Sequence, residues 1–191
     1  MAYSTYLREG ARVAIRGIRA ADGPEFTARA RESRELHHPW LFPPLTAEEF
    51  EPWAARLAEG DQRAGFLVCE RETGAAAGFV NVNNIVRGAF QCGALGYGAF
   101  AHAAGRGLLR EGLALVLAHA FAPAGQGLGL HRLEANVQPA NTASIALARG
   151  AGFRLEGLSP DFLHVNGAWR DHERWALTTE MRAPEGADHR G

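Results

Sequence analysis

The spacing of apolar residues alternates between two periods along the chain and predicts an order of strands and helices. An alternating run over 13–18 and further short runs of strand-forming residues between turn residues predict strands. These are expected over 13–18, 66–70, 78–83, 94–100 and 131–137, with two more near 153–165 and 169–178. Apolar residues at helical spacing, bounded by start and stop signals, predict helices over 22–35, 46–59, 105–121 and 141–152.

A proline-rich segment interrupts the helical pattern early in the chain. The stretch from His37 to Pro44 holds three prolines and two aromatic residues, which cannot continue a helix. Directly after it, Thr46 and Glu49 have the spacing of a capping box, which predicts the start of the next helix. We therefore expect a rigid loop between the first two helices.

The whole pattern fits one α/β domain. The chain has 191 residues, of which 47% are hydrophobic and 21% charged, as in globular domains. No internal repeat or linker-like stretch divides it. We expect a single domain over 1–182 and a loose tail over 183–191.

The charge balance argues against nucleic acid as a direct partner. Twenty Lys and Arg against twenty-one Asp and Glu give a net charge of −1, without the excess of basic residues that nucleic-acid binding favours. All twenty basic residues are Arg. Catalysis by a lysine, whether through a Schiff base or a P-loop, is therefore excluded.

Cysteine usage and the apolar runs predict a cytoplasmic protein. Cys69 and Cys92 lie in apolar surroundings, as reduced core thiols do, and form no CxxC motif. The first residues lack the plan of a signal peptide, and no apolar run is long enough to span a membrane. The histidines include no pair at metal-ligand spacing with supporting carboxylates, so no metal is expected.

Two segments carry candidate chemistry. At Gly105-Arg106-Gly107 a glycine-rich loop runs into a helix, and such a junction offers free N–H groups and the positive end of the helix dipole to a phosphate. A simple tight turn is the alternative. Further on, Asn141 and Ser144 lie three residues apart in a first helical turn, so both side chains can face one ligand. The alternative is that Asn141 is only a helix N-cap.

The order of these pieces resembles the GCN5-related N-acetyltransferase superfamily, and within it the RimJ/RimL branch of ribosomal-protein-alanine N-acetyltransferases, with the RimJ type the closer match. The resemblance covers about residues 10–182. Its most specific stretches are 81–90, Leu95-Gly96-Tyr97, 130–136, Asn141-x-x-Ser144, Gly150-Ala151-Gly152-Phe153 and 166–172.

The resemblance implies a fold, a donor and a binding site. The fold would be a mixed, mostly antiparallel sheet of about seven strands, splayed at the fourth and fifth and flanked by about four helices. The donor would be acetyl-CoA, with its pantetheine arm in contact with Asn141 and along the backbone of Tyr97, Gly98 and Ala99. Its pyrophosphate would lie on the amides of Gly105, Arg106, Gly107, Leu108, Leu109 and Arg110.

Several positions depart from the superfamily pattern. Ala104 and Leu109 stand where that pattern has a polar and a small residue, which would weaken donor binding without removing the backbone amides. Ala148 stands where many members have a tyrosine acid, and the resemblance implies Ser144 as its replacement. Asn136 stands where some relatives have a glutamate base.

The general base is open at this stage. Glu134, on the same strand face as Asn136, is the nearest carboxylate, and Asp161 or a water are alternatives. No protein nucleophile is required, since a neutral amine can attack the thioester directly, and Cys69 reads as a buried strand residue.

The acceptor is expected to be a primary amine. Deprotonating a lysine amine at neutral pH costs about 3.5 kcal/mol more than deprotonating an α-amine, so a site without an assured base suits an α-amine. The resemblance points to a protein N-terminus beginning with Ala or Ser, and Trp40 and Phe42 are candidate walls of the acceptor site. A small amine acceptor and a non-catalytic CoA-binding sensor are the alternatives. We expect a monomer or a homodimer, with no membrane partner.

Overall fold

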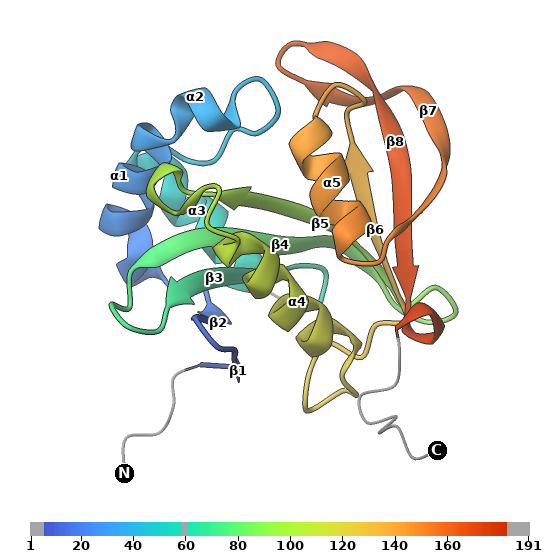
Figure 1. Ribbon diagram of the computed structural model, residues 1–191, viewed down its shortest axis with the longest axis horizontal. Helices are drawn as coiled ribbons and strands as arrows, with labels where there is room; N and C mark the ends of the chain where they lie inside the picture. Colours follow the sequence, from blue (N-terminus) through green and yellow to red (C-terminus); the bar gives the residue numbers. More distant parts are fainter. Residues whose placement is uncertain (1–5, 59–60, 183–191) are drawn as a thin grey trace.

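An eight-stranded sheet organises the part of the chain that the computed structural model describes, residues 6–58 and 61–182 (Figure 1). Its strands are β1 (Arg8–Glu9), β2 (Val13–Gly17), β3 (Ala64–Glu70), β4 (Ala76–Val86), β5 (Cys92–Ala99), β6 (Arg132–Val137), β7 (Arg154–Val165) and β8 (Ala168–Thr178). The helices are α1 (Gly23–Glu32), α2 (Arg34–His37), α3 (Ala47–Ala58), α4 (Leu108–Phe121) and α5 (Thr142–Gly150). Three short 3-10 turns, η1 (Ala20–Asp22), η2 (Ala101–Ala103) and η3 (Thr179–Met181), complete the elements.

The sheet opens at its one parallel pair of strands. The strand order is β1-β2-β3-β4-β5-β6-β8-β7, and β5 with β6 is parallel while every other neighbour is antiparallel. Pairing of β5 with β6 ends at Leu95 and Ala135, although β5 continues to Ala99 and β6 to Val137. The two strands therefore diverge, which confirms the splayed, mostly antiparallel sheet expected from the sequence.

Helices cover both faces of the sheet (Figure 1). The aromatic cluster of Phe26, Phe50 and Phe79 buries α1 and α3 against one face. On the other face, Leu113 of α4 packs in a cluster with Val68 of β3, and α5 joins the same cluster beside β6. None of the described helices has the length and apolar character needed to cross a membrane.

The predicted elements agree with the structure apart from a few boundaries. The helix expected over 22–35 is divided at Ser33, whose hydroxyl donates to the carbonyl of Arg29 at 2.6 Å and accepts from the amide of Ala101 at 2.8 Å. The two-residue strand β1 was not predicted, because so short a segment has no period to detect. The expected tail over 183–191 lies outside the described residues.

Candidate active site

A cavity of about 420 Å³ lies where β5 and β6 diverge. It is lined by residues of α2 and the loop after it, of β5, of the loop before α4, and of α5. Among the residues expected to bind the donor, its walls include Tyr97, Gly98, Ala99, Gly105, Gly107, Leu109, Arg110 and Asn141. The structure thus brings together segments that the sequence analysis placed on separate elements.

The first turn of α4 forms one end of this cavity. Gly107 is the N-cap of α4 with φ of +75°, and Gly105 has φ of +73°, a left-handed backbone that glycine adopts without strain. No side chain caps the helix, so its first-turn N–H groups are available to a ligand. Leu108 is 2% exposed and its side chain packs in the core, so it can contribute only its amide.

The two arginines of this turn differ in what they bind. The guanidinium of Arg106 donates to both carboxylate oxygens of Glu70, at 2.9 and 3.1 Å, so it is paired within the protein and does not line the cavity. Arg110 does line the cavity, and among the described residues its side chain makes no hydrogen bond or ion pair. The free cation of this turn is therefore Arg110, whereas the sequence analysis considered only its amide.

A hydroxyl pair lies at the other end of the cavity. Tyr97 Oη and Ser144 Oγ are 2.9 Å apart, across the divergence of the two strands. Burial raises the pKa of Tyr97, and the hydrogen bond with Ser144 opposes that rise, so the phenol is protonated near neutral pH. The sequence analysis assigned only the backbone of Tyr97 and missed this hydroxyl.

Asn141 is both an N-cap and a cavity residue. Its Oδ1 accepts from the backbone N–H of Ser144 at 3.1 Å, as a capping side chain does. Its side chain also lines the cavity, and Nδ2 has no hydrogen-bond partner among the described residues. The two interpretations of Asn141 are therefore compatible.

A second cavity of about 120 Å³ adjoins the first and shares Trp40, Leu41, Tyr97, Asn141 and Ser144 with it. Its remaining walls come from β5, β6, the residue after β6, and β8: Leu95, Gly96, Ala135, Asn136, Val137, Gln138 and His172. Since Ser144 and Tyr97 stand at the junction, the two cavities meet at the hydroxyl pair.

The loop after α2 is fastened to the end of β5. The imidazole of His37 makes a 2.8 Å hydrogen bond from Nε2 to the carbonyl oxygen of Ala99. Burial lowers the pKa of His37, although this hydrogen bond opposes the change. At Gly98 an added Cβ would come within 2.6 Å of Leu41, so glycine permits the close approach of the loop. Trp40, in this loop, lines both cavities, and its role as a wall of the acceptor site stays a prediction.

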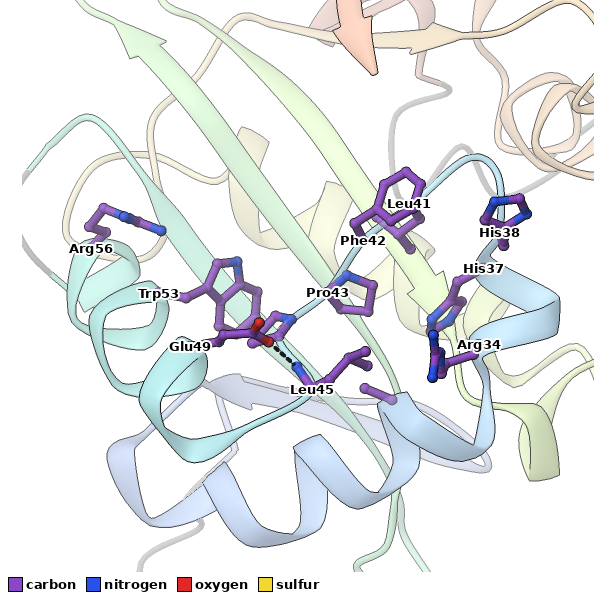
Figure 2. Close-up of a pocket in the computed structure, with 12 residues that line it drawn as sticks. Arg34, His37, His38, Leu41, Phe42, Pro43, Leu45, Glu49, Trp53 and Arg56 are labelled. Atoms are coloured by element: carbon purple, nitrogen blue, oxygen red, sulfur yellow. Dashed lines mark hydrogen bonds between the residues drawn. The ribbon is translucent and has the colours of Figure 1, made fainter. Parts of the chain in front are cut away.

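Phe42 lies elsewhere. It is 55% exposed and lines a separate pocket of about 510 Å³ between α2 and α3, which Figure 2 shows together with Trp53 and Glu49. Neither cavity at the diverging strands includes it. Of the two aromatic residues, only Trp40 lines the cavities that Ser144 also lines.

The carboxylates proposed as bases are also placed elsewhere. Glu134 accepts from Arg132 at 3.0 Å and from Arg174 at 2.9 Å, so both of its oxygens are paired. Asp161 donates its backbone N–H to Asp171 at 2.9 Å. Neither Glu134 nor Asp161 lines the two cavities, so the structure gives no support to either as the base.

Cys69 lies away from the residues that line the two cavities. Cys69 is 1% exposed in the cluster beneath α1 and α3, and burial raises the pKa of its thiol, although neighbouring Arg16 opposes the rise. Within residues 6–58 and 61–182, no three His, Cys, Asp or Glu side chains gather as metal ligands.

Comparison with known proteins identifies the family. Residues 12–154 match the family model of the acetyltransferase (GNAT) domain. A [ribosomal protein uS5]-alanine N-acetyltransferase of Escherichia coli is 30% identical over 182 residues, 91% of each chain. A probable N-acetyltransferase of Bacillus subtilis, YjcK, is 28% identical over 178 residues, 88% of this chain and 95% of that protein.

Solved structures agree with the sequence relatives. Mycobacterium smegmatis RimJ, in complex with CoA-disulfide, has a TM-score of 0.79 at 29% identity, over 88% of this chain and 82% of that one. The ribosomal-protein-S5-alanine acetyltransferase of Vibrio fischeri has a TM-score of 0.79 at 25% identity, over 91% and 96%. The chain therefore belongs to the GNAT family and is an N-acetyltransferase that uses acetyl-CoA as its acetyl donor.

Proposed function

We propose that this enzyme acetylates the N-terminal α-amine of a protein that begins with Ala or Ser, in the cytoplasm. The observation that carries the proposal is the 30% identity, over 91% of both chains, with an enzyme named for acetylating an alanine of ribosomal protein uS5. The physical features of the cleft support the same acceptor class.

The donor fits the larger cavity in one direction. The uncapped first turn of α4, with Arg110 beside it, suits the pyrophosphate of acetyl-CoA. From there the walls lead along Gly98 and Tyr97 to Ser144, a path that suits the pantetheine arm, with Nδ2 of Asn141 as a donor to it. The acetyl group then lies at the junction of the two cavities.

The hydroxyl pair supplies a proton to the leaving sulfur. Bound acetyl-CoA brings a thioester whose carbonyl carbon is attacked by the amine and whose sulfur departs. Ser144 Oγ gives that sulfur a proton, and Tyr97 Oη, 2.9 Å away, orients the hydroxyl and keeps it protonated. Tyr97 lies on β5 and Ser144 on α5, so the two hydroxyls are brought together only in the folded protein.

The smaller cavity suits a single amine on a neutral chain. Among the described residues that line the two cavities there is no Asp or Glu. A polyamine carries several cations and would leave them without counterions in such a site, which costs free energy. A peptide N-terminus has one amine and a neutral backbone, which Asn136 and Gln138 can hydrogen-bond.

The test is a comparison of acceptors at fixed acetyl-CoA, read as CoA release. We expect turnover with peptides that begin with Ala or Ser and no turnover with the same peptides already acetylated at the N-terminus. An otherwise identical peptide with an internal lysine as its only amine is the matched control. Release with spermidine or amino acids but with no peptide would refute the proposal.

A further inference from the structure

His172 is a buried imidazole that the reaction described so far does not use. It lies on β8 and is 3% exposed. The neighbouring residue, Glu173, pairs with Val137 at the C-terminal end of β6, so His172 lies just beyond the end of the β6–β8 pairing. It lines the smaller cavity together with Ser144 and Tyr97.

The hydrogen bonding of His172 fixes which of its nitrogens is basic. Nδ1 lies 2.8 Å from the carbonyl oxygen of Arg170, and a carbonyl can only accept, so Nδ1 carries a proton. In the neutral ring Nε2 then bears a lone pair. Nε2 has no hydrogen-bond partner among the described residues, so that lone pair is not committed within the protein.

Two arginines lie on the same face of β8 as His172: Arg170, whose side chain makes no hydrogen bond or ion pair among the described residues, and Arg174, which is paired. On the same face of β8, Arg174 is bonded to Glu134 of β6 at 2.9 Å and lies over the ring of Phe162 of β7, 4.4 Å from its centroid. The edge of that ring also contacts His172. Asp171 accepts the backbone N–H of Asp161. The loop before α3 and helix α5 place no charged side chain in this cavity.

We propose that Nε2 of His172 is the general base that takes a proton from the attacking amine, an inference that rests on the proposed transfer to a primary amine. The acceptor enters as an ammonium group, and two of its protons leave as the N–C bond forms and the C–S bond breaks. One proton passes to Nε2 and then to solvent. The other replaces the proton that Ser144 gives to the sulfur.

The cavity arrangement separates the two proton transfers. Ser144 stands at the junction with the donor cavity, whereas His172 lines only the smaller cavity. Acid and base therefore stand at different places in the cleft, so that Nε2 can take the proton of the amine while Ser144 protonates the departing sulfur. This role also explains how the site works without the carboxylate base, since Asn136 lines this cavity where a glutamate would otherwise stand.

The test uses His172→Asn, because the Asn amide can keep a donor to the carbonyl of Arg170 while the basic nitrogen is lost. The control is His119→Asn, a substitution of an imidazole on α4 that packs against Phe66, away from both cavities. Both variants are measured for thermal stability, for CoA affinity, and for kcat/KM between pH 6 and 9. The acceptor is the Ala-starting peptide or, if the parent does not acetylate it, a small primary amine.

We expect His172→Asn to bind CoA as the parent does and to lose about 100-fold in kcat/KM at pH 7, within the range of general base catalysis. Below the pKa of the amine, the parent can use the abundant ammonium form because Nε2 takes its proton, whereas the variant needs an acceptor that has already lost that proton. The log(kcat/KM) of His172→Asn should therefore rise with a slope of one up to the pKa of the amine, and its deficit against the parent should shrink over that range. His119→Asn keeps the parent profile.

A loss of the same factor at every pH, with the parent slope kept, would overturn the base role in favour of a structural one. Unchanged kcat/KM would also overturn it. If the parent acetylates the peptide and His172→Asn does so equally well, the proposed function stands and only the base role of His172 is refuted. If the parent acetylates only a small amine and His172→Asn shows the expected change in pH profile, the base role of His172 stands and the proposed protein acceptor is refuted.

Discussion

Substitutions at Asn141 separate the capping role of this side chain from its binding role. Oδ1 caps α5 through the 3.1 Å bond from the amide of Ser144. Asn141→Ala removes that acceptor, which costs about 1 kcal/mol. For a domain of this length, that cost lowers Tm by about 2–4 °C. Asn141→Asp keeps an acceptor and places a negative charge at the helix N-terminus, which adds about 0.3–1 kcal/mol of stability.

Affinity for CoA follows a different order. Since Oδ1 is used by the helix, Nδ2 is the group left for the donor molecule, and a neutral hydrogen bond is worth about 0.5–1.5 kcal/mol. Both Asn141→Ala and Asn141→Asp lose this N–H, so each should weaken CoA binding by about twofold to twelvefold. The Tm of Asn141→Asp should thus equal or exceed that of the parent, and the Tm of Asn141→Ala should be the lowest of the three. The affinity for CoA should instead be highest in the parent.

Thermal unfolding and calorimetric titration with CoA measure the two properties on the same samples. Thr46→Ala is the control, because Thr46 caps α3 by accepting from the amide of Glu49 at 3.3 Å, far from both cavities. It should lower Tm and leave CoA affinity unchanged. If Asn141→Asp binds CoA as tightly as the parent, Asn141 is a helix cap only, and the reasoning about Nδ2 is wrong.

Three further predictions concern single side chains of the cleft and of α4. Ser144→Ala should lower kcat at least tenfold in steady-state assays, with Tm and CoA affinity near the parent values, since the hydroxyl acts mainly in the transition state; a change in KM for acetyl-CoA alone would make it a binding residue. Arg110→Ala should weaken CoA binding about threefold to tenfold by titration, and Arg106→Ala should not, because its guanidinium is bound to Glu70. Burial by itself raises the pKa of Glu111, but hydrogen bonds from the amides of Arg12 and Val13 and from the guanidinium of Arg12 lower this pKa below its usual value. The ionised carboxylate therefore stabilises the fold at neutral pH, and this stabilisation is lost as the pH falls through the lowered pKa. Urea unfolding of Glu111→Gln should show a loss of about 1–2 kcal/mol at pH 7 that shrinks toward acid pH, and a pH-independent loss would contradict the assignment.

The parts of the site that depend on local sequence were predictable. The glycine loop before α4 and the pair Asn141 and Ser144 each span a few consecutive residues, so local spacing alone predicted that they stand at the starts of two helices. The strands from β2 to β8 were also predictable from local sequence, since each is a short run of strand-forming residues between turn residues.

The parts of the site that depend on contacts between distant segments could not be predicted from the sequence. Tyr97 and Ser144 are 47 positions apart, and nothing in either neighbourhood indicates that their hydroxyls meet. The pairing that removes Arg106 from the cavity and leaves Arg110 there depends on Glu70, which ends β3, 36 positions before Arg106. Glu134 was considered as the base because it lies on the same strand face as Asn136. In the folded chain, however, Arg132 of β6 and Arg174 of β8 pair with it.

The divergence of β5 and β6 links the fold to the chemistry. Beyond Leu95, β5 keeps its ladder with β4 and has no ladder with β6. Tyr97 and Ala99 both line the cavity on that side, and the carbonyl of Ala99 is taken by His37. The backbone groups of Tyr97 have no partner strand there, and an unpaired N–H or C=O costs free energy. We infer that the amides of the pantetheine arm pair with them as a substitute strand. In that proposed pose the donor would complete the sheet at Tyr97, whose phenol is hydrogen-bonded to Ser144, and one contact would then bind the donor and align the acid.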